Sequence, residues 1–366
     1  MTNLMNIPNK EGKILLGPKD LDALTPDHKI VGVFNPAATR FDGDILLLVR
    51  VTEEPIQTDP GRLISPRAYD QDGDTCWTID VFDPASVISQ DPRTLYFSDG
   101  RIRLRHISHF RLVRLSADGA HVEEVRILDS LLPHEPWEEF GIEDPRISRI
   151  GDTYYITYVA ISRQMGIATA LMTTCDFQTF KRRGIIFPTE NKDVVLLPEK
   201  WDGHYVAYHR PVSRSQIDTP SIWTSLSPDG IFWGRHQHLI SPRPGAWDSL
   251  RVGAGPPPVR ISQGWLLIYH GVAPATPQSP VGHYCAGAVL LDPENPTRIL
   301  ARSRDALLSP ERPYETHGYT PGVVFPTGII FDDDRETITL FTGGADEIVA
   351  SLSIQLQVVL DYLGIS

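Results

Sequence analysis

A chain of 366 residues with 41% hydrophobic and 22% charged residues has a globular composition and is long enough for one large domain or two ordinary ones. Its net charge of −12 argues against nucleic acid or an anionic membrane as the main partner. The longest apolar runs, such as ILLLV at 45–49, are too short to span a bilayer, and residues 1–13 lack the apolar segment of a signal peptide.

The chain has three cysteines, which are odd in number and far apart: Cys76, Cys175 and Cys285. They predict reduced thiols in the core of a cytoplasmic protein, without a disulfide framework or zinc-type spacing. The high content of breakers, 31 prolines and 28 glycines, indicates many short strands and turns.

A hairpin plan recurs along the chain: a short apolar strand with a proline near its end, a turn, and a second strong strand. The five copies are FNPAATRFDGDILLLVR (34–50), EDPRISRIGDTYYITYV (143–159), LLPEKWDGHYVAYHR (196–210), GPPPVRISQGWLLIYH (255–270) and VFPTGIIFDDDRETITLFTG (324–343).

Further strand pairs follow the first four hairpins. They are FRLVRLSADGAHVEEVRIL (110–128), IATALMTTCDFQTFKRRGIIF (167–187), IWTSLSPDGIFWGRHQHLI (222–240) and CAGAVLLDPENPTRILARS (285–303). The unit is therefore about four strands, repeated five times. Four-stranded units in radial repetition predict an all-β, five-bladed β-propeller as a single catalytic domain over residues 1–366.

The last unit has one further strand, EIVASLSI (347–354), and lacks a fourth. We expect GKILLGP (12–18), near the N-terminus, to close this last blade and cover its open edge. The segment IQLQVVLDYL (354–363) predicts a short C-terminal helix. A pair of β-sandwiches is the alternative fold, but it does not explain five matching hairpins.

In a propeller the first strand of each blade lines the central channel, so matching positions of the repeats converge. The residues before the prolines are Asn35, Asp144, Leu197, Pro257 and Phe325. The ends of the second strands, with the turn after the last one, supply Arg50, Tyr158, His209, Arg210, His270 and Asp346. Buried polar groups cost free energy unless they are paired or bind a ligand. We therefore predict the functional site at the mouth of the channel, where these strand ends meet.

The segment GIEDPRI (141–147) places two acids at one strand exit. Because side chains of a strand alternate, Asp144 is expected to point into the channel and Glu143 away from it, as a substrate contact or a support. The alternative is that both acids pair with Arg146 or Arg149. We favour a catalytic role for Asp144.

Basic groups recur on the following blades: Lys192, Arg210, Arg251 and His270. Three cations and a histidine suit a compact dianion such as phosphate. The alternative is local pairing, of Lys192 with Asp193 and of Arg251 with Asp248.

Aromatic residues also stand near these strand ends, and most are expected in the core: Trp137, Tyr158, Tyr208, Tyr269, Tyr284 and Phe325. Tyr284 and Phe325 are those we expect to contact a sugar. His106 and His109 would face opposite sides of a strand, which is a poor metal pair, so no metal is predicted.

Together these blocks resemble glycoside hydrolase family 130, the β-mannoside phosphorylases and related mannosidases. The resemblance covers nearly the whole chain, and its motifs are FNPAA, EFGIEDPRI, ENKDVVLLPEK, AYHRP, GAGPPP, GWLLIYHG, VVFPTG and GGAD. It implies a five-bladed propeller, an inverting reaction on a β-mannoside, no cofactor and inorganic phosphate as co-substrate.

The resemblance also implies roles. Asp144 falls on the proton donor, which acts by way of a sugar hydroxyl. Asn35, Arg50 and Asp346 fall on residues that hold the terminal mannose, and the phosphate positions fall on or near Lys192, Arg210, Arg251 and His270. Two departures stand out: Arg251 replaces a lysine, and GGAD replaces YGAAD, leaving Gly343 where an aromatic residue often sits.

Three functions follow. The first is phosphorolysis of β-mannosides to α-mannose 1-phosphate. The second is an inverting β-mannosidase with Glu199 or Asp248 as the base. The third is a sugar-binding propeller without catalysis. The linkage (β-1,2 or β-1,4) depends on an acceptor subsite in the loops 212–220 and 272–284, and both the acceptor sugar and a homo-oligomeric state stay open.

Overall fold

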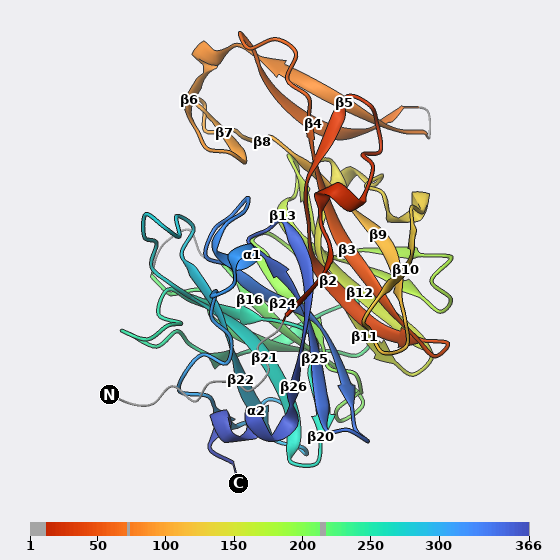
Figure 1. The fold of residues 1–366 in the computed structure, drawn as a ribbon, viewed down its shortest axis with the longest axis vertical. Helices are drawn as coiled ribbons and strands as arrows, with labels where there is room; N and C mark the ends of the chain where they lie inside the picture. The colour runs from red at the N-terminus through yellow and green to blue at the C-terminus, as the bar shows by residue number, and fades with distance from the viewer. Residues whose placement is uncertain (1–11, 72–73, 213–216, 366) are drawn as a thin grey trace.

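A computed structural model describes residues 12–71, 74–212 and 217–365 (Figure 1). Its elements are almost entirely β-strands, so the prediction of an all-β fold is confirmed. Within the described residues the strands form five larger antiparallel sheets, numbered here in chain order, and two small ones.

Sheets 1 and 2 each contain four strands. Sheet 1 has the order β2 (His28–Phe41), β3 (Asp44–Pro55), β9 (Ile107–Leu115), β10 (Val122–Arg126). Sheet 2 has the order β11 (Ile142–Ile150), β12 (Thr153–Ser162), β13 (Gly166–Thr174), β14 (Lys181–Phe187).

Sheets 3 and 4 repeat this plan. Sheet 3 has the order β15 (Asn191–Leu196), β16 (Tyr205–Pro211), β17 (Ile222–Ser227), β18 (Gly234–Ile240). Sheet 4 has the order β19 (Arg251–Ala254), β21 (Gly264–Ala273), β22 (His283–Leu291), β23 (Ile299–Arg302), and β20 (Val259–Ile261) also pairs with β21.

Sheet 5 joins the two ends of the chain. Its order is β24 (Val324–Asp332), β25 (Thr337–Gly344), β26 (Ile348–Gln355), β1 (Lys13–Leu16). The prediction that 12–18 supplies the missing fourth strand is therefore confirmed, and β1 pairs antiparallel with β26.

Short helices connect these strands: η1 (Pro18–Asp20), η2 (Pro84–Ser86), η3 (Asp129–Leu131), η4 (Pro136–Glu138), α1 (Pro313–Thr316) and α2 (Leu356–Leu363). Helix α2 confirms the predicted C-terminal helix. It ends at Gly364, whose left-handed φ of 71° is the usual helix stop. None of the described helices is long and apolar enough to cross a membrane.

An insertion between β3 and β9 interrupts sheet 1. It contains a two-stranded sheet, β4 (Leu63–Gln71) and β5 (Asp74–Phe82), and a three-stranded sheet, β6 (Val87–Gln90), β7 (Thr94–Phe97) and β8 (Ile102–Leu104). Both project from the five larger sheets at the top of Figure 1. The sequence analysis did not foresee this insertion.

Hairpin turns fix the register of the repeats. Asp42 and Gly43 have φ values of 50° and 89° between the paired residues Phe41 and Asp44. Two consecutive residues with positive φ are what a tight type I′ hairpin requires, and Asp-Gly supplies them at low cost. The predicted turn of the first repeat is thus confirmed.

Buried hydrophobic side chains of the described residues form five clusters, each between two neighbouring sheets. Successive clusters join sheets 1 and 2, 2 and 3, 3 and 4, and 4 and 5, and another joins sheet 5 to sheet 1 through Phe341 and Val49. Each sheet therefore buries both of its faces against its neighbours.

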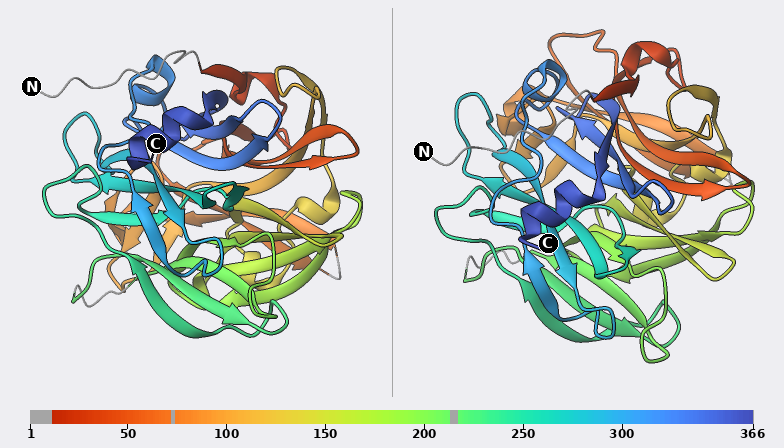
Figure 2. Two further views of the ribbon diagram at one scale, coloured as in Figure 1. Left: turned by 90° about the horizontal axis from the view of Figure 1, so that it is seen from below. Right: turned by 60° about the horizontal axis from the view of Figure 1, so that its bottom comes forward.

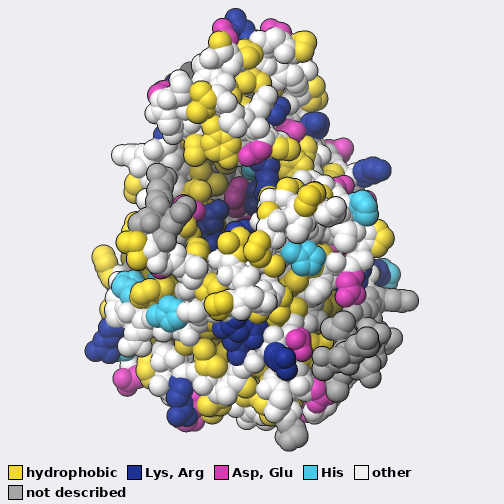
Figure 3. Space-filling view, turned by 90° about the vertical axis from the view of Figure 1, so that its left-hand side faces the viewer, with side chains coloured by type: hydrophobic (Ala, Val, Ile, Leu, Met, Phe, Trp, Pro, Cys, Tyr) yellow, Lys and Arg dark blue, Asp and Glu magenta, His cyan; other side chains and the backbone are white. Residues whose placement is uncertain are grey.

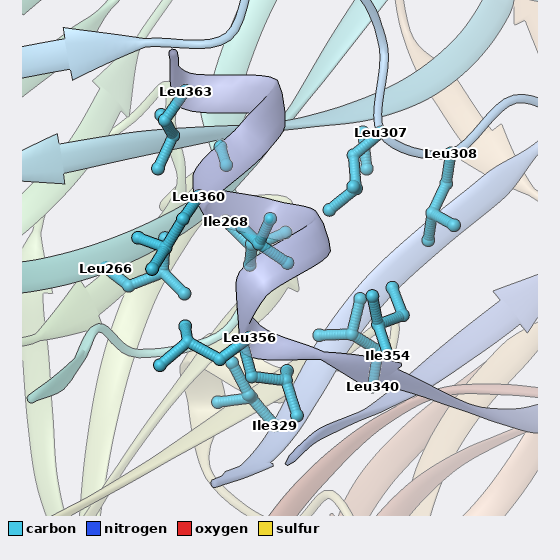
Figure 4. Packing of buried hydrophobic residues seen from close by; sticks show 14 of the residues in the cluster. Leu266, Ile268, Leu307, Leu308, Ile329, Leu340, Ile354, Leu356, Leu360 and Leu363 are labelled. Atoms are coloured by element: carbon cyan, nitrogen blue, oxygen red, sulfur yellow. The ribbon is translucent and has the colours of Figure 1, made fainter. Parts of the chain in front are cut away.

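Helix α2 adds its apolar face to the cluster between sheets 4 and 5. Leu360 lies beside Leu266 and Ile268 of β21, and Leu356 lies beside Ile329 of β24 (Figure 4). The helix lies across the ends of these sheets, with the C-terminus on the outside (Figure 2). It thus covers one end of the apolar layer that joins the last two sheets.

The cysteines only partly match the prediction of core thiols. Cys285 is buried, whereas Cys175 is exposed because it follows the end of β13 in a surface turn. The side chain of Cys76 lies outside the described part.

Candidate active site

A cavity of about 540 Å³ lies where strands of all five sheets meet beneath the insertion. On the face shown in Figure 3 it is a hollow in which acidic and basic side chains gather. Ten of the eleven predicted site residues line it: Asn35, Arg50, Glu143, Asp144, Lys192, Arg210, His270, Tyr284, Phe325 and Asp346. The other, Arg251, contacts the lining residue Tyr284.

The two adjacent acids both face the cavity, so the prediction that Glu143 points away is wrong. The β11–β12 register shifts between Glu143 and Arg146, and Asp144 has a φ of 52°. This bulge breaks the alternation of the strand and turns both carboxylates to one side. A non-glycine residue held at positive φ is strained, which is common at functional sites.

Arg50 binds both acids. Its Nη2 donates to Glu143 Oε1 at 2.7 Å and its Nη1 to Asp144 Oδ1 at 3.0 Å. Burial would raise the pKa of Glu143, but the charge of Arg50 outweighs it and holds that pKa well below its usual range. The alternative pairings fail, because Arg149 pairs with Asp152, and Arg146 meets Asp144 through its backbone oxygen and pairs with Asp193.

Asn35 completes this acidic flank. It too stands at a bulge with a φ of 48°, and its Nδ2 donates to Asp144 Oδ1 at 2.8 Å. Gly343 makes this arrangement possible, since a Cβ there would lie 2.1 Å from Asn35 Oδ1. Position 343 can therefore hold no aromatic side chain while Asn35 keeps this position.

The basic flank is built around one acid, Asp193. Arg210 Nε donates to its Oδ2 at 2.7 Å, and Arg146 Nη2 and His270 Nε2 lie 3.8 and 3.5 Å from its carboxylate. Burial would raise the pKa of Asp193, but Arg210 and the neighbouring positive charges lower it. Gly253 allows this approach, because a Cβ there would lie 2.4 Å from Asp193 Oδ2.

Two cations of this flank have no acidic partner among the described residues. Lys192 makes no ion pair there, although after Arg50 and His106 its charge also helps to lower the pKa of Glu143, and Arg251 donates to Tyr284 Oη and to the Val281 oxygen. The expected alternative of local pairing is thus wrong for both. Asp248 is occupied by Arg243 and Arg302.

Comparison of this chain with known proteins shows the family to which it belongs. A family model described as beta-1,4-mannooligosaccharide phosphorylase, of glycoside hydrolase family 130, matches residues 74–364. The chain belongs to glycoside hydrolase family 130.

Relatives within family 130 cover most of the chain. The beta-1,2-mannobiose phosphorylase of Listeria innocua is 36% identical over 98% of this chain and 99% of its own length. The 1,2-beta-oligomannan phosphorylase of a Thermoanaerobacter species is 36% identical over 66% of this chain and 77% of its own. The solved structure of the Listeria innocua beta-1,2-mannobiose phosphorylase in complex with beta-1,2-mannobiose superposes with a TM-score of 0.86, at 35% identity over 96% of this chain and 97% of that one.

Sequence reasoning assigned no role in the site to several residues that line or support this cavity, and four of them are charged or titratable. They are Arg93 and His106 of the insertion and its exit, and Asp193 and Arg146 on the basic flank. His106 is buried beside Glu143, 3.6 Å from its Oε1, and neither ring nitrogen has a hydrogen-bond partner in the described part.

Several other predicted positions lie outside the cavity. Leu197 and Pro257 do not line it, because β15 bulges at Asp193 and β19 ends before the prolines 256–258. Tyr158 instead donates to Glu138 in the core. His109 is buried against Glu53, away from His106, and no cluster of three or more metal-binding side chains occurs in the described ranges.

Loop 272–284 reaches the cavity through Pro280, Val281 and Tyr284, as expected of an acceptor-subsite loop. The described residues of 212–220 do not line the cavity, and 213–216 lie outside the described part.

Two buried histidines predict how stability depends on pH. Burial lowers the pKa of His209 and of His270 to about 3. Between pH 6.5 and 3 the unfolded chain therefore binds more protons than the folded one, and stability falls as pH falls, by roughly 1.4 kcal/mol per pH unit for each histidine. Urea unfolding between pH 7 and 5 checks this, and His209→Gln is expected to reduce the slope. A slope equal to that of the parent protein would contradict the assignment.

Proposed function

We propose that the chain is one five-bladed β-propeller catalytic domain. Five similar sheets, each packed between two neighbours, with the fifth on the first, support a closed ring. The innermost strands β2, β11, β15, β19 and β24 carry lining or supporting residues, as the channel strands of a propeller do.

We further propose that this domain is a β-mannoside phosphorylase that converts a β-mannoside and phosphate to α-mannose 1-phosphate and a shortened sugar. The observation that carries the proposal is the division of the cavity into two flanks. Sheets 1, 2 and 5 supply an acidic, amide-bearing flank, and sheets 3 and 4 supply a basic flank in which Lys192 and Arg251 form no ion pair with a described residue.

The acidic flank suits a sugar and its leaving oxygen. In this mechanism the terminal mannose is held by Asn35, Arg50, Glu143, Asp346, Tyr284 and Phe325. Asp144 supplies the proton to the leaving oxygen by way of a sugar hydroxyl. Asn35 and Arg50 fix its Oδ1 and leave Oδ2 for the substrate. Acid assistance is needed because the glycosidic bond breaks through an oxocarbenium-like state.

The basic flank suits the nucleophile. Lys192, Arg210, Arg251 and His270 bind phosphate and align it for in-line attack on the anomeric carbon from the face opposite the leaving oxygen, which inverts the configuration. His270 is neutral near pH 7, because burial lowers its pKa to about 3, so it acts as a hydrogen-bonding group and not as a cation. Charge comes from the lysine and the arginines.

Hydrolysis is the weaker candidate. It needs a carboxylate that activates water, and neither expected base lines the cavity: Glu199 is exposed, and Asp248 is fully buried among Arg243, Tyr269 and Arg302. Glu143 and Asp193 line the cavity, but arginines lower their pKa values, which makes both carboxylates weak bases.

The linkage proposed is β-1,2. The relative that matches almost the full length of this chain is named for beta-1,2-mannobiose, which supports that disaccharide as substrate. The free thiols of Cys175 and Cys285 support a reducing compartment, the cytoplasm. A homo-oligomeric state stays a prediction.

The test is product analysis with β-1,2-mannobiose and β-1,4-mannobiose, each with and without phosphate. Release of α-mannose 1-phosphate only when phosphate is present, and faster from the β-1,2 disaccharide, is the expected result. Free mannose as the only product, at the same rate without phosphate, would show a hydrolase. No cleavage of either sugar would favour a binding protein.

A further inference from the structure

The turn between β6 and β7 reaches from the insertion into the mouth of the cavity. Asp91, Pro92, Arg93 and Thr94 all line it, so an element that interrupts sheet 1 supplies part of the wall. In Figure 3 the hollow lies directly beneath this part of the molecule. None of these residues has a role in the mechanism proposed above.

Arg93 crosses to the opposite wall. Its Nη1 lies 3.2 Å from Asp346 Oδ2, with side chains 34% and 14% exposed. Its guanidinium also lies 5.9 Å from the ring of Tyr319. The ion pair therefore joins the insertion to the acid that the proposed function assigns to the terminal mannose.

The backbone around Arg93 is held in place. Its N–H donates to Asp91 Oδ1 at 2.8 Å, and its carbonyl accepts from the amide of Arg105 at 2.8 Å. The hydroxyl of Tyr319 has one proton and lies 2.9 Å from Glu54 Oε1 of β3 and 3.3 Å from the Pro92 oxygen, so it can donate to either. These contacts hold the turn beside Arg105 and Tyr319, so the guanidinium approaches Asp346 from a defined direction.

Asp346 depends on such a partner. It stands in the β25–β26 turn, where Ala345 and Asp346 have φ values of 47° and 53°, so its backbone is set by a tight turn. Arg93 is the cation with which it forms an ion pair among the described residues. Arg50 also acts on it, since the charges of Glu143, Asp144 and Asp346 together raise the pKa of that buried arginine, but removing Arg93 would leave Asp346 without its ion-pair partner in the described part.

We propose that Arg93 is a positioning residue of the donor subsite, which orients the Asp346 carboxylate to accept hydrogen bonds from the terminal mannose. This inference rests on the proposed function. It makes the insertion part of the machinery that recognises the transferred sugar. The inference is confined to the donor subsite, so it predicts that the binding of the acceptor sugar and of phosphate does not depend on Arg93.

Kinetics in both directions test this inference. For Arg93→Ala, the KM for β-1,2-mannobiose in phosphorolysis and the KM for α-mannose 1-phosphate in synthesis are expected to rise about 5- to 20-fold. The KM values for phosphate and for acceptor mannose should stay within about twofold, as expected of groups without contact to the pair. Arg93→Lys, which keeps the charge, should restore both donor KM values to within about threefold of the parent.

Arg101→Ala is the matched control, because Arg101 lies in the same insertion, pairs with Asp99 and does not line the cavity. Its KM values should equal those of the parent protein. Unchanged donor KM values in Arg93→Ala would overturn the inference, and so would an equal rise for all four substrates. If the parent protein forms no α-mannose 1-phosphate at all, the proposed function itself is wrong, which is a separate outcome.

Discussion

Replacing Asp144 with asparagine is expected to lower kcat for phosphorolysis by about 10²- to 10⁴-fold, the usual contribution of a general acid. The amide keeps the size of the side chain and one oxygen to accept from Asn35 and Arg50, but it has no proton to give. KM for the mannoside should therefore change little, while turnover is lost. Steady-state phosphate-release or phosphate-consumption assays on the purified variant measure both.

Asp152→Asn is the matched control for this substitution. Asp152 lies in the turn between β11 and β12, at the far end of the same hairpin, with a fully exposed side chain. This control should keep the parent kcat. If Asp144→Asn kept more than about a tenth of the parent kcat, the proton would have to come from another group, and the assignment of the acid would be wrong.

The repeat predicted most of the scaffold because its signal is local. Turns rich in glycine or aspartate and strongly β-forming second strands fix each hairpin by short-range geometry, and five copies along one chain fix the number of larger sheets. The pairing of β1 with β26 was also predictable, since a sheet that lacks a strand leaves an open edge. The insertion at 56–106 escaped prediction because it has no counterpart in the other four repeats.

The site was predicted less completely than the scaffold, and bulges explain why. Alternation along a strand placed Glu143 outside the cavity, whereas the bulge at Asp144 brings both acids to one arginine. Selecting the residue before each repeat proline identified Asn35 and Asp144. It did not identify Asp193, because no proline follows the bulge that this residue forms in β15. Positive φ joins these three residues, and only a structure shows it.

Contacts between side chains far apart in the sequence could not be predicted at all. Arg93 and Asp346 are separated by most of the chain, and nothing local to either predicts their pairing. The same holds for Gly343, which looked like a lost aromatic side chain and is required by its contact with Asn35. These positions are set by how neighbouring sheets pack.

The second large effect is expected from a substitution in the basic flank that weakens phosphate binding, and Arg251 is the best residue to replace. Arg210 already pairs with Asp193, so removing it would also weaken the pairing of a buried acid, whereas the partners of Arg251 among the described residues, Tyr284 and Val281, are neutral. For Arg251→Gln we expect the KM for phosphate to rise about 10- to 100-fold, the worth of one or two charge-assisted hydrogen bonds. KM for the mannoside should change far less.

Arg251→Lys separates charge from shape. If phosphate needs only a positive charge at this position, lysine restores the parent KM for phosphate. If phosphate instead needs the two parallel hydrogen bonds of a planar guanidinium, lysine restores the KM for phosphate only in part. Arg260→Gln is the control, because Arg260 lies in the same sheet but contacts Trp265 and the Pro293 oxygen, and neither of these residues lines the cavity. Initial rates over a phosphate series measure the KM for phosphate. If the Arg251→Gln variant had the KM for phosphate of the parent protein, Arg251 would not belong to the phosphate site, and Lys192 would be the remaining cation there without an ion pair among the described residues.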